Sequence, residues 1–107
     1  MGKIDLSIIV LSFNTKDLLR QCLKSLDQKF ELIVVDNNSS DGSQEMVKKE
    51  FSAVVLIENK ANQGYAKGNN IGLKHAHGNY ILFLNSDTEV FKGALEEAVG
   101  FMKKIPK

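Results

Sequence analysis

The chain has 107 residues, of which 43% are hydrophobic, so one domain with its own core is expected. The formal charge is +1 and the lysines are scattered, which argues against nucleic acid as a partner. No apolar run is long enough for a transmembrane segment, and the lone cysteine, Cys22, falls within an apolar helical face, as a buried thiol would. We therefore expect a cytoplasmic protein, one that can also work at the inner face of a membrane.

Four short apolar runs alternate with segments of helical period, and each run stops at a cluster of polar residues, mainly Asn, Asp or Ser. The runs cover residues 6–11, 32–35, 54–57 and 81–84. The alternation predicts strand and helix in turn, and therefore a Rossmann-like α/β fold with a parallel sheet and flanking helices. Ligands of such sheets bind beyond the carboxyl ends of the strands, so the polar clusters are expected to share one ligand-binding edge.

The first two helices follow the first two runs. The first is expected at about residues 15–26, and the apolar stripe that should pack on the sheet consists of Leu18, Leu19, Cys22, Leu23 and Leu26. The second opens near Asp41, and Gln44 follows with the spacing of a capping box. We expect Asp41 to cap this helix rather than to contact a ligand.

The third helix contains Gly64, Gly68 and Gly72, one glycine in every four residues. Each costs the helix about 1 kcal/mol relative to alanine, so something must approach the bare stripe closely. Tight packing on the sheet is the favoured interpretation, and direct contact with a ligand is the alternative. The adjacent Asn69 and Asn70 are weak helix formers, so at least one of these amides is expected to bind a loop or a ligand. A fourth helix is expected near residues 92–104.

Familiar phosphate-binding motifs are missing. A dinucleotide site would show Gly-x-Gly-x-x-Gly after the first strand, but residues 11–16 read LSFNTK, and no P-loop sequence occurs anywhere. A bound diphosphate would therefore need another counter-charge, such as a divalent metal held by a carboxylate. Asp87, just after the fourth run, is placed to hold it.

Four segments in order resemble family 2 glycosyltransferases, most closely the rhamnosyltransferase-like branch. They are VLSFN (10–14), VVDNNSSDGS (34–43), NQGYAKGNNIG (62–72) and LNSDTEV (84–90). The resemblance covers almost the whole chain. It implies a GT-A fold, Mg²⁺ or Mn²⁺ as cofactor, and transfer of a sugar from a nucleotide diphosphate sugar to a saccharide or lipid-linked acceptor in polysaccharide biosynthesis.

The resemblance also implies which residues bind the donor. It places Ser12, Phe13 and Asn14 under the nucleoside and Asp36 at the base or ribose, although Asp36 can instead brace the loop that follows it. The other donor-binding residues that it implies are Asn38, Gly64, Lys67, Asn70, Asn85, Ser86 and Asp87. For Lys67, an ordinary surface position is the favoured interpretation.

The metal motif departs from the family pattern. The family has Asp-x-Asp, whereas this chain has Asn85-Ser86-Asp87, so Asp87 is left as the metal ligand. With one carboxylate fewer, the metal should bind weakly unless diphosphate oxygens complete its coordination.

The catalytic residues stay unassigned, because in the family the base and the acceptor-binding elements follow the metal motif. We expect residues 1–107 to form a single nucleotide-sugar-binding domain, the N-terminal part of a longer glycosyltransferase and inactive alone. A nucleotidyltransferase-like enzyme is one alternative, but it should carry a glycine-rich basic loop after the first strand. A non-catalytic nucleotide- or metal-binding module is the other, but it leaves the glycine stripe unexplained.

Overall fold

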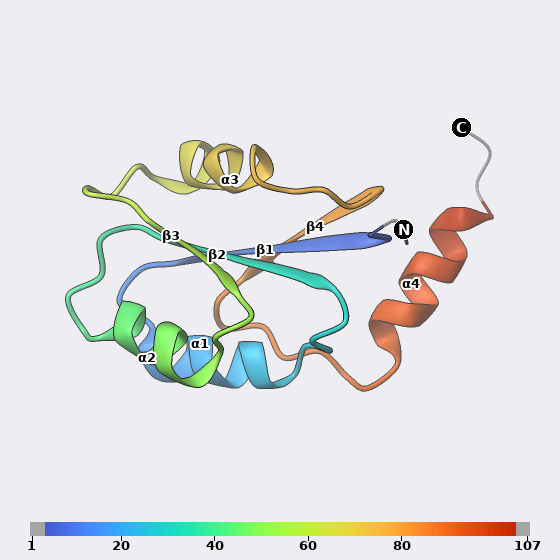
Figure 1. Ribbon diagram of the computed structural model, residues 1–107, viewed down its shortest axis with the longest axis horizontal. Helices are drawn as coiled ribbons and strands as arrows, with labels where there is room; N and C mark the ends of the chain where they lie inside the picture. Colours follow the sequence, from blue (N-terminus) through green and yellow to red (C-terminus); the bar gives the residue numbers. More distant parts are fainter. Residues whose placement is uncertain (1–3, 105–107) are drawn as a thin grey trace.

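The computed structural model describes residues 4–104, which form a four-stranded parallel sheet with helices on both faces (Figure 1). The strands are β1 (Leu6–Ser12), β2 (Glu31–Asp36), β3 (Val55–Glu58) and β4 (Tyr80–Asn85), and they lie in the order β3-β2-β1-β4. The helices are α1 (Lys16–Lys24), α2 (Ser43–Glu50), α3 (Tyr65–Leu73) and α4 (Ala94–Lys103). The predicted α/β fold with a parallel sheet is confirmed.

The register of the sheet brings the polar strand ends together. Ser12 at the end of β1 pairs with Asp36 at the end of β2, and Leu11 pairs with Asn85 at the end of β4. The chain moves from β1 to β2 in one direction and returns to β4 on the other side of β1. The sheet therefore has a topological switch point at β1 and β4, where open α/β sheets bind their ligands.

Alternate residues of the strands fill two cores, one on each side of the sheet. On one side Ile8, Val10 and Val34 pack with the buried residues of α1, α2 and α4. On the other side Ile9 and Val35 belong to a smaller core beneath α3. Figure 1 shows α3 alone above the sheet, with α1 and α2 below it.

The expected stripe of α1 is confirmed except at one position. Leu19, Cys22, Leu23 and Leu26 are buried, whereas the side chain of Leu18 is 51% exposed. The buried residues follow the spacing i, i+3, i+4, i+7, and Leu18 lies about 100° from Leu19 around the helix, outside that stripe. The apolar face is therefore narrower than the sequence pattern suggested.

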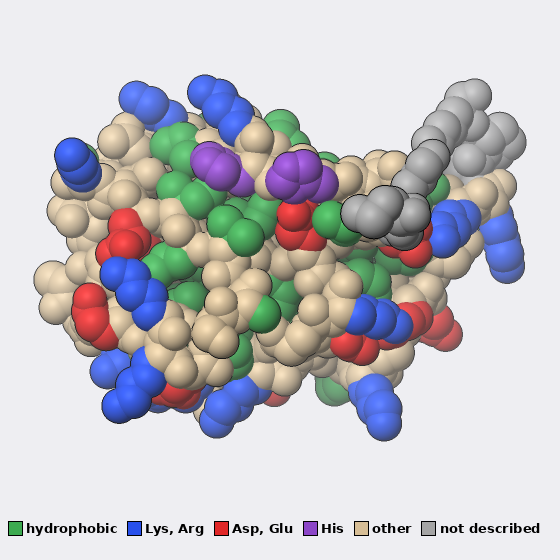
Figure 2. Space-filling model, viewed as in Figure 1, with side chains coloured by type: hydrophobic (Ala, Val, Ile, Leu, Met, Phe, Trp, Pro, Cys, Tyr) green, Lys and Arg blue, Asp and Glu red, His purple; other side chains and the backbone are tan. Residues whose placement is uncertain are grey.

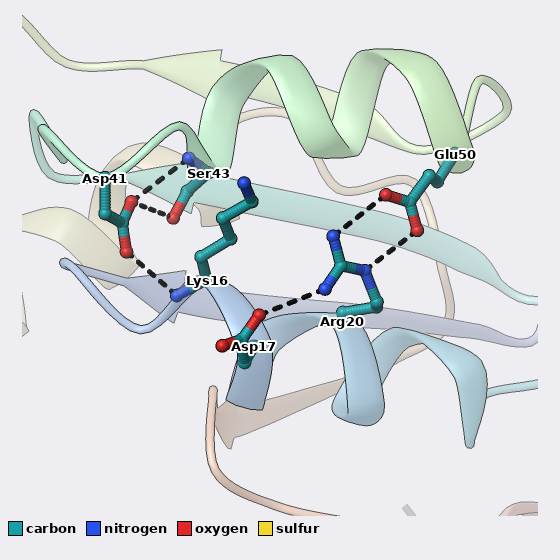
Figure 3. Close-up of polar contacts among 6 residues, drawn as sticks. All are labelled: Lys16, Asp17, Arg20, Asp41, Ser43 and Glu50. Carbon is teal, nitrogen blue, oxygen red and sulfur yellow. Dashed lines mark hydrogen bonds and ion pairs between the residues drawn. The ribbon is translucent and has the colours of Figure 1, made fainter.

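The capping box predicted for α2 is wrong. Gly42, in the left-handed region with φ of 88°, directly precedes the helix, and Asp41 instead accepts bonds from the amides of Ser43 at 3.0 Å and Lys16 at 2.9 Å (Figure 3). Burial alone would raise the pKa of the Asp41 carboxyl, but these hydrogen bonds and that of the Ser43 hydroxyl lower it. The Gln44 side chain donates to Asp36 and to the Ser39 carbonyl instead. Asp41 thus fixes the start of α2 against the start of α1.

An ion pair joins the same two helices further along. The guanidinium of Arg20 on α1 donates two hydrogen bonds, of 2.9 and 3.0 Å, to the carboxylate of Glu50 at the end of α2 (Figure 3). A third bond of 3.0 Å reaches Asp17 within α1. Bidentate pairs of this kind fix geometry better than single contacts do, so α1 and α2 are held parallel along one face.

The opposite end of the sheet has its own polar cluster. Glu31, at the start of β2, accepts hydrogen bonds from the buried Ser7 hydroxyl at 2.6 Å and from the His77 amide at 2.7 Å, and its carboxylate lies 2.8 Å from His77 Nδ1. Partial burial alone would raise the pKa of the Glu31 carboxyl, but these partners lower it. His75 and His77 are exposed, and Figure 2 shows the two histidine side chains close together.

Two of the three glycines of the third helix allow close packing on the sheet. A Cβ atom on Gly68 would lie 2.6 Å from Leu11 Cδ1, and one on Gly72 would lie 2.6 Å from Ile9 Cγ2 and 2.9 Å from Val35 Cγ2. The packing interpretation is therefore confirmed for both. Gly64 differs: it precedes α3 with φ of 79° and would meet nothing within 4 Å. It belongs to the turn rather than to a stripe.

We predict that Gly72→Ala destabilises the domain by about 1–3 kcal/mol, because Ile9 and Val35 are buried and cannot move away from the new methyl group. Gly100→Ala is the matched control, since a Cβ at this position of α4 meets nothing. There the gain in helix propensity should stabilise the domain by up to about 1 kcal/mol. Thermal melts of both variants test this. Equal shifts of the two melting temperatures would contradict close packing at Gly72.

Candidate functional site

The residues predicted to bind a ligand lie on loops at the carboxyl edge of the sheet. The β1–α1 loop carries Phe13, whose side chain is 46% exposed, and Asn14, which is exposed and left-handed with φ of 51°. The amide of Asn14 donates to the Ser39 hydroxyl at 2.8 Å, and Asn14 Oδ1 accepts from the Ser40 amide at 2.8 Å. The loops after β1 and β2 are therefore tied into one surface.

Asp36 is the central residue of the loop after β2. Asp36 is only 1% exposed. Its carboxylate accepts hydrogen bonds from the Ser39 amide at 2.8 Å, the Ser39 hydroxyl at 2.6 Å and the side-chain amide of Gln44 at 2.7 Å. Both carboxylate oxygens are therefore occupied by the protein itself. This geometry is that of a loop brace, the alternative raised from the sequence. Asn38, two residues further along the same loop, is exposed.

Asn37 is a structural residue of the site that sequence analysis missed. It is buried, its Nδ2 donates to the Gly64 carbonyl at 3.2 Å, and its Oδ1 accepts from Asn59 Nδ2 at 2.9 Å and from the Gln63 amide at 3.2 Å. It therefore connects the end of β2 to the loops before α3. The only signal in the sequence was its place in the polar cluster after the second apolar run.

On α3 one of the two asparagines is buried and the other is exposed. Asn69 is 7% exposed, and its Oδ1 is buried without a hydrogen-bond partner among residues 4–104. Asn70, the predicted donor-binding residue, is exposed, as are Gly64 and Lys67. Asn69 follows the tightly packed Gly68 by 100° around the helix, whereas Asn70 follows it by 200° and faces away. We expected at least one of these two side-chain amides to bind a loop or a ligand. The buried one, Asn69, has an oxygen without a partner among residues 4–104.

A chain of hydroxyl groups joins the ends of β1 and β4. The buried Ser12 hydroxyl lies 3.1 Å from Thr15 Oγ1, which lies 2.7 Å from the hydroxyl of Ser86, itself 8% exposed. Asn85 and Asp87, on either side of Ser86, are both exposed. Ser12 and Ser86 are thus buried, whereas Asp87 beside them is exposed. Thr15 was not among the predicted site residues.

Cys22 lies below this edge as a structural thiol. It is buried, and its Sγ lies 4.0 Å from the Asn85 carbonyl. Burial, together with the negative charge of nearby Asp87, raises the pKa of the thiol to about 11. The thiol is therefore protonated at neutral pH, and the expectation of a buried thiol is confirmed.

A metal ion would have to share its coordination with a ligand. Among residues 4–104, no group of three or more His, Cys, Asp or Glu side chains could hold a metal by itself. The exposed carboxylate of Asp87 is a hard oxygen donor of the kind that Mg²⁺ and Mn²⁺ prefer. Asp87 would therefore suit a divalent cation whose other ligands come from outside the described residues.

The family model for glycosyl transferase family 2 matches residues 7–107, and the chain belongs to this family. An uncharacterized glycosyltransferase of Haemophilus influenzae is 38% identical over 104 residues, which cover 91% of this chain and 42% of that protein. The poly(ribitol-phosphate) beta-glucosyltransferase of Bacillus spizizenii is 35% identical, with 92% and 17% covered. The GalNAc(5)-diNAcBac-PP-undecaprenol beta-1,3-glucosyltransferase of Campylobacter jejuni is 37% identical, with 84% and 32% covered. The chain thus spans less than half the length of these relatives.

Solved structures confirm the GT-A fold. Staphylococcus aureus TarS 1-349 in complex with UDP superposes with a TM-score of 0.84 at 28% identity, over 94% of this chain and 32% of that one. The mannosyltransferase PcManGT of Pyrobaculum calidifontis, solved with GDP-Man and Mn²⁺, has a TM-score of 0.84 at 24% identity, over 99% and 34%. None of these proteins is named as a rhamnosyltransferase, so that branch stays a prediction. Within residues 4–104, no helix is long and apolar enough to span a bilayer.

We predict that Asp36→Asn destabilises the domain by about 1–3 kcal/mol, because an NH₂ group replaces one of the two carboxylate oxygens that accept from Ser39 and Gln44, and this group cannot accept a hydrogen bond. The control is Asn38→Gly, which changes an exposed residue of the same loop whose φ of 70° glycine also adopts, so it should change the melting temperature much less. If Asp36 serves only as a ligand contact, Asp36→Asn will lower nucleotide affinity and leave the unfolding free energy of the free domain as it is.

Proposed function

We propose that this chain is the donor-binding part of a glycosyltransferase that takes a sugar from a nucleotide diphosphate, with Mg²⁺ or Mn²⁺, and transfers it to a saccharide or lipid-linked acceptor. The observation that carries the proposal is the exposed carboxylate of Asp87 at the switch point of the sheet, beside the polar loop after β1. Family membership favours this function over the nucleotidyltransferase-like and the non-catalytic alternatives.

The nucleoside would lie on the joined loops after β1 and β2. Phe13 offers a half-exposed aromatic ring against which a base can stack, and Asn14 and Asn38 offer exposed amides for hydrogen bonds. Ser12 lies under this surface, since its hydroxyl is buried and bonded to Thr15. Asp36 acts here by holding the loop in place, which makes it a positioning residue.

The diphosphate would lie towards Asp87. The chain has no glycine-rich phosphate loop. The charge of the diphosphate would therefore be balanced by the cation that Asp87 holds and, to a smaller extent, by the exposed Lys67. When bound, the cation stabilises the negative charge of the departing nucleoside diphosphate. Asn85 and Ser86 complete this side with an amide and a hydroxyl, and Gly64 and Asn70 lie on the side of α3.

Transfer would proceed by direct displacement. A base takes the proton of the acceptor hydroxyl, the oxygen forms a bond to the anomeric carbon, and the bond to the diphosphate oxygen breaks with its electrons on the leaving group. The residues assigned above serve the leaving-group side. Because the chain spans 42%, 17% and 32% of the three relatives, we propose that the base and the acceptor site come from further sequence and that residues 1–107 alone do not transfer sugar.

The place of action follows from the acceptor. The Campylobacter relative is named for an undecaprenol-linked acceptor and the Bacillus relative for a poly(ribitol phosphate) one. We propose that this protein works in the cytoplasm, at the inner face of the membrane, where a lipid-linked acceptor would be presented. Sugar specificity, hexosyl or deoxyhexosyl, is part of the same proposal.

We predict that UDP or GDP binds more tightly in Mn²⁺ or Mg²⁺ than in EDTA, and that Asp87→Ala reduces the affinity in metal to the value in EDTA. Isothermal calorimetry on the 107-residue chain measures both. Glu45→Ala, which removes one exposed acid from α2, is the charge-matched control and should retain the effect of the metal. Equal affinities with and without metal would rule out Asp87 as a metal ligand.

A second prediction concerns the missing acid. Asn85→Asp should strengthen Mn²⁺ binding without nucleotide, because the added carboxylate gives the cation a second charged ligand. Without metal the two acids repel each other, so the variant should melt at a lower temperature than the parent in EDTA and gain more from Mn²⁺. A rise in melting temperature of the same size in both conditions would contradict a metal site here.

A further inference from the structure

Thr15 stands at the position that usually caps a helix, but its side chain does not cap α1. Its backbone carbonyl accepts the first helical hydrogen bond, from the Leu19 amide at 2.7 Å, and its hydroxyl makes no bond to the helix amides. A threonine cap typically stabilises a helix by about 1 kcal/mol. The hydroxyl instead lies between Ser12 and Ser86, at 3.1 and 2.7 Å. The side chain is therefore used for a contact other than helix stability.

This contact extends the pairing of β1 and β4 by one residue. The last pair of the β1–β4 ladder is Leu11 with Asn85. Ser12 and Ser86 are therefore the first opposed residues beyond this ladder. Their side chains are buried, and Thr15 fills the space between the two hydroxyls. The turn after β4 is thus held by a side chain where the backbone pairing stops, directly before Asp87.

The chain of hydroxyls also leaves one proton unused. Three hydroxyl groups carry three protons, and the two bonds among them consume two. If Ser12 donates to Thr15 and Thr15 donates to Ser86, the Ser86 proton is free. Bonds aligned in one direction polarise one another, so an anion beside Ser86 would favour this orientation and strengthen the whole chain.

We propose that Thr15 is a positioning residue of the donor site: its hydroxyl holds Ser86, and with it Asp87, against Ser12, and directs the Ser86 proton to a diphosphate oxygen. The inference rests on the proposed function of this edge. In the proposed site the nucleoside would lie over Ser12 and the diphosphate beside Ser86, so the Thr15 hydroxyl would connect the two parts of the donor site. The effect of the metal on nucleotide affinity should then depend on the Thr15 hydroxyl.

The test uses the 107-residue chain with UDP and GDP as probes, in Mn²⁺ and in EDTA. Thr15→Val keeps the branched shape and removes the hydroxyl, and it should lower affinity in Mn²⁺ by about five- to tenfold, the loss of one or two hydrogen bonds. The affinity in EDTA should change much less. Thr15→Ser restores the hydroxyl and should bring the affinity in Mn²⁺ back to within about twofold of the parent.

Two further variants separate positioning from stability. Ser7→Ala removes a buried hydroxyl at the opposite edge, where Ser7 bonds Glu31 and the Gly78 amide, and should lower the melting temperature without changing nucleotide affinity. Ser86→Ala should reproduce the loss seen in Thr15→Val. The double variant should lose little more than either single one, since both remove the same contact.

The outcomes are distinct. If the parent chain binds neither probe, the proposed function fails and this inference fails with it. If the parent binds and Thr15→Val binds equally well in Mn²⁺, only the inference on Thr15 is wrong. The inference is also overturned if Thr15→Val loses as much affinity in EDTA as in Mn²⁺, if Thr15→Ser does not recover, or if the effects of Thr15→Val and Ser86→Ala simply add.

Discussion

The buried carboxylate of Asp36 determines how the loops of the candidate site are arranged. Burying an ionised carboxyl is costly unless hydrogen bonds replace its water, and three donors from Ser39 and Gln44 do so. Ser39 in turn accepts from the Asn14 amide, so the loop after β1 takes its shape from the loop after β2. A single charge at the end of one strand thereby orders two of the loops that present the proposed donor-binding residues.

Close contact between helix and sheet extends this order to the third loop. Gly68 and Gly72 let α3 lie on Leu11, Ile9 and Val35, and Asn37 binds the Gly64 carbonyl where that helix begins. Backbone packing and one buried amide together fix the height and the starting point of α3. The edge of the sheet is therefore built from elements that cannot shift independently, as a pre-organised binding site requires.

The sequence was sufficient to predict the strands and their shared polar edge, because the alternation of apolar runs and helical segments leaves few topologies open. Details that depend on tertiary contacts were not predictable. The spacing of Asp41 and Gln44 suits a capping box, but the Gln44 side chain donates to the buried carboxylate of Asp36 instead. The sequence did not show which of Asn69 and Asn70 faces inward, because this depends on how α3 lies on the sheet.

Cys22 gives this edge a built-in reporter. With a pKa of about 11, roughly one thiol in ten thousand is ionised at pH 7, and the sulfur is buried beneath the Asn85 carbonyl. Alkylation can therefore proceed only when α1 and the turn after β4 separate, and its rate would measure that local opening. Anything that holds the turn in place, whether a nucleotide or a cation, would slow the alkylation of this native cysteine.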